Sequence, residues 1–150
     1  MRLSVATPLA IIVDADDVAH LRAEDETGAF GILTGHADFV TALAISVVSW
    51  RDKSGAEHHV AVRGGMLQVR GGDKIAIAAP EAVPGDDLRE LESDVLVRFR
   101  RQLAAEQAAR TDAQRLYLAA IRQIVRFLRP ERIVAVPGGN AAAPAEGLES

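Results

Sequence analysis

Four histidines are the residues of this 150-residue chain that most invite a chemical role. His58 and His59 are adjacent, so on a strand their rings point to opposite faces and cannot easily share a metal ion. His36 and Asp38 have the spacing of two metal ligands, but no third ligand with suitable spacing lies near them in the sequence. We therefore expect histidines that are solvated or bonded within loops, and no bound metal.

The sequence also lacks the usual motifs for phosphate binding and nucleophilic catalysis. The Gly-Gly pairs at 64–65 and 71–72 lie between expected strands, with no helix N-terminus to receive a phosphate. No serine-centred nucleophile elbow is present. Acidic residues cluster at 14–17 and 24–26 beside turns, where solvated loops are favoured over a paired general acid and base. These observations favour a binding protein without a cofactor over an enzyme.

Composition and charge divide the chain into two parts. Residues 1–87 hold seven basic and 13 acidic side chains, whereas residues 88–129 hold nine arginines and five acids. Cysteine is absent, which excludes disulfides and thiolate metal sites. Pro8 interrupts the first apolar run, no signal peptide is visible, and no apolar run approaches the roughly 20 residues that span a bilayer. We expect an acidic front part and a basic back part with different roles.

Residues 1–86 are predicted to form a β-sandwich. Apolar and polar residues alternate with a period of two and are often interrupted by turn residues. The clearest hairpin turns at 71–73, because Gly-Gly tolerates the positive φ of a tight turn. The stretch 28–43 is apolar but broken by three glycines and a histidine, which predicts a strand over 30–33, a loop over 34–38 and re-entry into the core at Phe39. Short strands without intervening helices favour a sandwich or barrel.

Residues 87–130 are predicted to be helical. Asp86 or Asp87 can cap the first helix, and one apolar face then recurs at steps of three and four residues, at Leu88, Leu91, Val95, Phe99 and Leu103. A second stripe comprises Tyr117, Ile121, Ile124 and Leu128, and Pro130 is expected to end the helix.

The two helical stripes favour an antiparallel two-helix hairpin, with the turn near Arg110 and Thr111. No glycine marks this turn, so one long helix is the competing interpretation. The composition of residues 131–150, rich in alanine, proline and glycine from 137 onward, predicts a flexible tail.

Three short segments of the sandwich region resemble the epsilon subunit of F-type ATP synthases. Residues 30–32 (Phe-Gly-Ile), 35–37 (Gly-His-Ala) and 41–43 (Thr-Ala-Leu) match the family's signature loop in order and spacing. Residues 63–69 and the junction at 85–88 are similar to further family segments, so the likeness covers about 1–130. The residues at 24–28 and 126–130 are most similar to those of the family's alternate branch, sometimes called N-ATPases.

This resemblance implies a non-catalytic rotor subunit. In the family a sandwich followed by helices binds the gamma subunit and rests on the c-ring, on the cytoplasmic face of the membrane. The residues that would touch the c-ring by resemblance are Glu26, Ala29, Phe30, His36 and Asp38. Membrane contact would then occur only through the c-ring, and the nucleotide-sensing motif known in some members is absent at 87–91.

The basic face of the helical region has several candidate partners. By resemblance, Arg115, Arg122, Arg126 and Arg129 would meet acidic segments of the alpha/beta catalytic hexamer and inhibit ATP hydrolysis. Nucleic acid is disfavoured, because the chain is acidic overall and these arginines are not accompanied by an aromatic stacking platform. Two other hypotheses remain: a β-sandwich binding module with a helical dimerisation hairpin, and a metal hydrolase using His36, Asp38 and a remote ligand.

Overall fold

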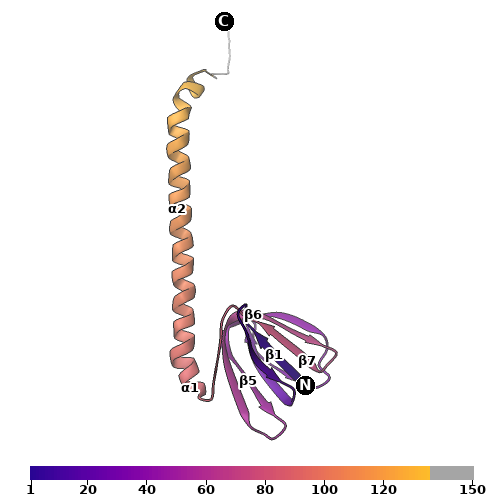
Figure 1. The fold of residues 1–150 in the computed structure, drawn as a ribbon. Coiled ribbons are helices and arrows are strands. Elements are labelled where there is room, and N and C mark those ends of the chain that lie inside the picture. The colour runs from indigo at the N-terminus through magenta and orange to yellow at the C-terminus, as the bar shows by residue number, and fades with distance from the viewer. Residues whose placement is uncertain (136–150) are drawn as a thin grey trace. The chain divides into compact units, whose positions relative to one another are not determined.

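The computed structural model describes residues 1–135, with side chains up to residue 128 (Figure 1). The chain separates into two compact units, Met1–Ala104 and the residues from Ala105 onward. The first unit contains all eight strands and the beginning of the helical region, and the second contains most of the long helix. Each unit is considered by itself.

The strands form the predicted β-sandwich. Seven strands follow the order β2-β1-β7-β6-β5-β3-β4, and β8 pairs with β6 outside this path. All neighbours are antiparallel except β1 and β7. The strands are β1(Arg2–Ala6), β2(Ile11–Ala15), β3(Val18–Asp25), β4(Gly28–Leu33), β5(Phe39–Asp52), β6(Glu57–Arg70), β7(Lys74–Ala78) and β8(Ala82–Gly85).

The two long strands, β5 and β6, connect the two layers. The first part of β5 pairs with the last part of β6, beside β7, whereas the last part of β5 also pairs with β3. The hydrogen-bonded ladder between β5 and β6 is interrupted at Ala44 and Gly64. On β5, the inward-facing residues are odd-numbered up to Leu43 and even-numbered from Ser46 onward. Gly65 has φ +118°, and a Cβ there would lie 2.3 Å from the Ala78 carbonyl oxygen, so this bend requires glycine.

An aliphatic core fills the space between the layers. Leucine, isoleucine and valine dominate it, which agrees with a chain that is only 4% aromatic. Inward positions alternate with exposed ones along the strands, as the period-two pattern predicts. The fully buried large side chains of the strands are Leu3, Val5, Val18, Leu21, Ile32, Val48, Val60, Val62, Leu67, Ile75 and Ile77.

The helical region begins firmly attached to the sheet. The Asp87 carboxylate caps α1(Leu88–Glu90) by accepting from the Arg89 and Glu90 amides. A π-helical turn, η1(Leu91–Val95), follows, closed by a bond from the Leu96 amide to the Leu91 carbonyl. This wide turn adds a residue to the helical repeat, so Leu91, Leu96 and Phe99 are buried rather than the evenly spaced stripe predicted from the sequence.

These three side chains form a second, smaller core on the outer side of β5 and β6. They pack with the fully buried Ala61 and with Ile45, Val47 and Val83. Glu81 adds an electrostatic tie, because its carboxylate lies 3.4 Å from Arg98 on the helix and 3.6 Å from Arg63 on β6. We call Leu88–Phe99 the anchor segment.

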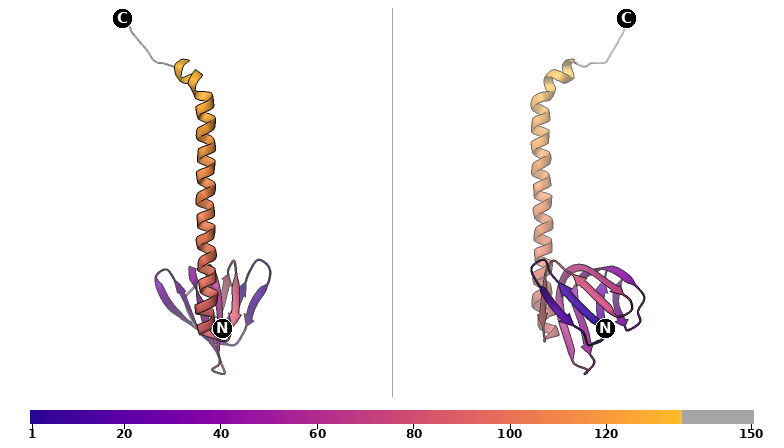
Figure 2. Two further views of the ribbon diagram at one scale, coloured as in Figure 1. Left: turned by 90° about the vertical axis from the view of Figure 1, so that its left-hand side faces the viewer. Right: turned by 45° about the vertical axis from the view of Figure 1, so that its right-hand side comes forward.

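The expected two-helix hairpin is wrong in this structure: the chain forms one helix, α2(Leu96–Ala135), as the competing interpretation proposed (Figure 2). Alanines and other strong helix formers occupy 104–109, and no glycine ends the helix. Thr111 does not cap a new helix, since its hydroxyl donates to the Gln107 carbonyl within the same helix at 3.0 Å.

The helix also continues through Pro130, which was expected to end it. Proline removes one helical hydrogen bond, and helix formers on both sides of it carry the helix to Ala135. Of the expected tail over 131–150, residues 131–135 are helical and residues 136–150 lie outside the described part of the chain.

Candidate protein-contact surfaces

Three turns of the sandwich meet around the first residues of β5. They are the β3–β4 turn (residues 25–28), the signature loop (residues 34–38) and the β6–β7 turn (residues 70–74). The Asp25 carboxylate fixes the first of these turns. One of its oxygens accepts from the Thr27 amide at 2.9 Å and the Thr27 hydroxyl at 2.6 Å, and the other accepts from the Thr41 hydroxyl on β5 at 2.8 Å.

These bonds also set the charge state of Asp25, which is only 9% exposed. The hydroxyls of Thr27 and then Thr41, with the Thr27 amide, hold the pKa of the Asp25 carboxyl below its ordinary value, because each bond favours the ionised form. Asp25 is thus a buried, ionised brace between two turns rather than a group available for proton transfer.

The Phe39 ring lies at the centre of the three turns. It meets the Phe30 ring of β4 edge-on, with ring centroids 5.6 Å apart. It also contacts the His36 ring, whose centroid lies 5.7 Å from its own. The His36 Nδ1 atom is also 2.7 Å from the Ala37 carbonyl oxygen, so the imidazole is bonded within its own loop. These contacts give the loop a defined conformation without a metal.

The signature loop is fastened to the β6–β7 turn by two hydrogen bonds. The Gly35 amide donates to the Gly72 carbonyl at 2.8 Å, and the Gly71 amide donates to the Asp38 carboxylate at 2.9 Å. Gly72 has φ +76°, and a Cβ there would lie only 3.0 Å from the Gly35 Cα. Glycine is therefore required at this position for both its φ and the close approach of the two loops.

The five residues assigned to the c-ring contact by resemblance fall on or beside these turns. Phe30 and His36 both contact Phe39, and Asp38 holds the β6–β7 turn. Glu26 and Ala29 are exposed, the first in the β3–β4 turn and the second at the start of β4. We call the three turns together the contact edge. Among the described side chains, which end at residue 128, no group of three histidine or acidic residues is placed to hold a metal ion.

A second candidate surface is the outer face of the layer containing β2, β1, β7, β6 and β5. The strand register aligns one row of apolar residues across all five strands, and the next row is mostly small or polar. We define this outer face by the apolar row Ala42, Met66, Ala78, Ala6 and Ile11 and by the adjacent row Val40, Gln68, Ala76, Ser4 and Asp14. Ile11, Val40 and Met66 are large exposed apolar side chains, so the face is flat, apolar and accessible.

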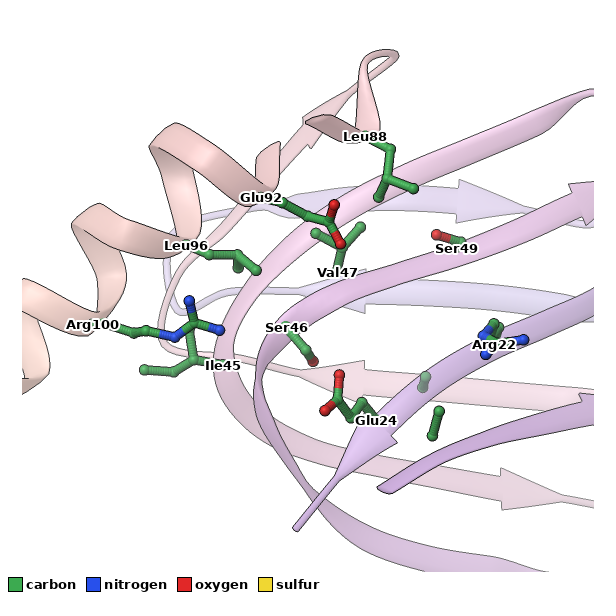
Figure 3. A pocket seen from close by; sticks show the side chains of 12 residues that line it. Arg22, Glu24, Ile45, Ser46, Val47, Ser49, Leu88, Glu92, Leu96 and Arg100 are labelled. Carbon is green, nitrogen blue, oxygen red and sulfur yellow. The ribbon is translucent and has the colours of Figure 1, made fainter. Parts of the chain in front are cut away.

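A groove lies beside the anchor segment, on the outer side of β3 and β5 (Figure 3). Its cavity volume is about 340 Å³. Ile45 and Val47 line it from β5, Arg22 and Glu24 from β3, and Glu92, Leu96 and Arg100 from the helical side. It combines an apolar floor with charges of both signs and presents no catalytic constellation.

The arginines of the back part lie on α2. Arg115, Arg122 and Arg126 are exposed, and the side chain of Arg129 lies outside the described residues. Arg115 is 3.9 Å from Asp112 in the preceding turn. The apolar stripe of the same helix is exposed as well, including Tyr117, Ile121, Ile124 and Leu128. Within residues 1–135, no helix is both long and apolar enough to cross a membrane.

The sequence of the sandwich defines its class. Residues 1–85 match the family described as the beta-sandwich domain of the ATP synthase delta/epsilon chain. The chain is 40% identical to "ATP synthase epsilon chain 2" of Paraburkholderia xenovorans over 132 residues, which cover 88% of this chain and 95% of that one. It is 39% identical to "ATP synthase epsilon chain 2" of Cereibacter sphaeroides over 152 residues, with 99% of each chain covered.

The chain therefore belongs to the ATP synthase epsilon-chain family, whose members are non-catalytic subunits of that enzyme. The printed name "epsilon chain 2" of both relatives is consistent with the alternate branch. Solved structures share the fold. A chain of the Euglena gracilis mitochondrial ATP synthase matches with a TM-score of 0.54 and 24% identity, covering 71% of this chain and 62% of that one. A chain from the Tetrahymena thermophila central stalk and c-ring matches with a TM-score of 0.50 and 17% identity, covering 63% and 71%.

Sequence reasoning missed the residues that brace the contact edge. Asp25 and Thr41 are far apart in sequence, and their pairing depends on a register shift between β3 and β5 that no local pattern encodes. The turn glycines were identified as hairpin residues, but their contact with the signature loop was not predicted. The only available signal was chemical: an acidic residue two positions before a threonine is typical of a side chain that bonds its own turn.

Proposed function

We propose that this chain is the rotor epsilon subunit that links the gamma subunit to the c-ring of an F-type, proton- or sodium-translocating ATP synthase, on the cytoplasmic face of the membrane. The observation that carries the proposal is the family match over the whole sandwich, together with relatives of nearly full length. The similar solved structures belong to an ATP synthase complex with its c-ring and to a central stalk with its c-ring, which is the setting the proposal requires.

The proposal divides the chain by role. Residues 1–86 are the docking domain, residues 87–130 are a helical arm, and residues 131–150 are a tail. The family match ends at residue 85, one residue before the proposed boundary, which supports this division. No residue is assigned to chemistry, and no nucleic acid or cofactor is involved.

The contact edge is proposed to rest on the c-ring through Glu26, Ala29, Phe30, His36 and Asp38. A rotor subunit must transmit torque, so its contact loops must keep their shape under load. The Asp25 brace, the Phe39 ring cluster and the bonds to the β6–β7 turn supply that rigidity. The membrane itself is contacted only through the ring.

The outer face is proposed to bind the gamma subunit. Its apolar row is exposed, flat and continuous over five strands, which suits burial against another protein. Replacing Ala78 at the centre of this row by arginine places a charge in the interface, and we expect gamma binding to fall by more than tenfold. Ala56→Arg in the exposed β5–β6 turn is the matched control and leaves binding unchanged. Equal effects of the two variants on titration with purified gamma would refute this assignment.

The arginines of the arm are proposed to contact the alpha/beta hexamer and restrain ATP hydrolysis. The exposure of Arg115, Arg122 and Arg126 on one helix and the net positive charge of this region support an acidic partner. Changing Arg115, Arg122, Arg126 and Arg129 together to alanine is expected to raise the hydrolysis rate of the assembled enzyme. An unchanged rate, with the subunit still bound, would remove the inhibitory role but not the docking role.

A further inference from the structure

Three basic residues stand side by side at the contact edge. Arg70 at the end of β6 is in register with Lys74 at the start of β7, and Lys74 is in register with Arg2 on β1. They continue the outer face by one further row. All three are exposed, and we call them the basic row.

Only one member of this row is neutralised. Arg2 donates to both carboxylate oxygens of Asp14, at 2.9 and 3.1 Å. Among the side chains of residues 1–128, neither Arg70 nor Lys74 has a carboxylate at ion-pair distance. The adjoining Asp38 is already engaged, because its carboxylate accepts the Gly71 amide.

Like charges in register on neighbouring strands repel each other and destabilise a sheet. Arg2 is paired with Asp14, but among the described side chains neither of the exposed neighbours Asp38 and Asp73 forms an ion pair with Arg70 or Lys74, so these two like charges stand side by side without a partner from the chain itself. Such conflicts are expected where a partner supplies the missing interaction. The partner must therefore bring negative charge to this row.

The position of the row indicates which partner that is. The β6–β7 turn, which joins Arg70 to Lys74, is fastened to the signature loop by the Gly35–Gly72 and Gly71–Asp38 bonds. A surface that contacts His36 must therefore also come close to the row. We propose that Arg70 and Lys74 form a second, electrostatic half of the c-ring contact and dock against carboxylates on the exposed loops of the ring. This inference rests on the proposed c-ring contact and adds residues and a partner chemistry to it.

The inference predicts a loss of binding without a loss of stability. The double variant Arg70→Glu/Lys74→Glu changes only exposed side chains, so the melting temperature of the isolated chain changes little. The same variant places carboxylates against carboxylates, so binding of its gamma complex to c-rings in zwitterionic nanodiscs falls about tenfold at low salt. Wild-type binding weakens as salt rises, whereas binding of the variant strengthens, because salt screens the repulsion between the carboxylates.

The matched control is Arg51→Glu/Lys53→Glu, which reverses two exposed cations beside the β5–β6 turn, away from the contact edge. It carries the same change in net charge and should leave ring binding unchanged. A fall of equal size in the control, or unchanged binding in the Arg70/Lys74 variant, overturns the inference.

Two further arms separate the competing explanations. His36→Glu should weaken ring binding in either case. If it does so while the Arg70/Lys74 variant does not, the basic-row inference fails and the proposed c-ring contact stands. If the wild-type gamma complex does not bind the ring at all, the proposed function fails. If binding requires anionic lipid and not the ring, the row faces headgroups and the carboxylate assignment is wrong.

Discussion

The contact edge and the long helix differ in how their conformations are stabilised. At the contact edge, three turns distant in sequence are tied together by a buried carboxylate, an aromatic cluster and two loop-to-loop hydrogen bonds. Along α2 beyond Phe99, large apolar side chains are exposed, and the polar contacts are local. The first region is held by contacts between segments distant in sequence, whereas the second leaves its apolar stripe exposed in the described residues.

The largest expected effect contrasts two phenylalanines of the same helix. Phe99 is fully buried in the small core, whereas Phe127 is 84% exposed. Phe99→Ala should destabilise the docked anchor segment by about 3–5 kcal/mol, the usual range for a core phenylalanine. Phe127→Ala should change stability by less than about 0.5 kcal/mol. Hydrogen exchange of residues 88–99 and urea unfolding measure the loss of stability in each variant. Losses of similar size in the two variants would contradict this contrast.

The second effect tests the brace at the contact edge. Asp25→Ala leaves the Thr41 hydroxyl and the Thr27 amide without their acceptor, and we expect a loss of about 1–3 kcal/mol in the free energy of unfolding. Asp16→Ala in the exposed β2–β3 turn is the control and should cost little. Urea unfolding at pH 7 compares the two variants.

The same brace gives a pH dependence with a defined sign. The Asp25 pKa is lower in the folded state than its ordinary value near 3.8, so ionised Asp25 favours folding. Its contribution is complete above that ordinary value and is lost as the pH falls through the lowered folded-state pKa. Melting temperatures from pH 6 to pH 2 should therefore fall more steeply for the wild type than for Asp25→Ala. Parallel curves would show that the carboxylate is not held in its ionised form.

The smallest effect distinguishes a continuous helix from a hairpin. Arg110 lies inside α2, where glycine costs about 0.7–1 kcal/mol relative to a good helix former. In a hairpin turn the same substitution would be neutral or favourable. Far-ultraviolet circular dichroism of Arg110→Gly should thus show reduced helicity, and unchanged or increased helicity would support a break at this position.

Local patterns predicted most of the sandwich and less of the helix. Alternation and turn glycines are enough to place strands, because a one-residue slip would expose every core side chain. The helical stripe was predicted with even spacing, but the π-helical turn moves burial from Val95 to Leu96. The hairpin was predicted from two separate apolar stripes, yet the alanines at 104–109 between them favour continuation of a helix.

The composition of the contact edge could not be predicted from local patterns. The loops at 34–38 and 70–74 were each recognised, but the bonds between them depend on the register of β5 with β6. The exposed cations Arg70 and Lys74 appear isolated in the sequence, and only the alignment of β6, β7 and β1 brings them into one row with Arg2.

Hydrogen exchange of the full chain, alone and in complex with gamma and the c-ring, tests the docking role of the sandwich most directly. We predict that complex formation slows exchange at amides of the signature loop and the β6–β7 turn and along the outer face. Protection confined to α2, with exchange at residues 34–38 and 70–74 unchanged, would contradict it.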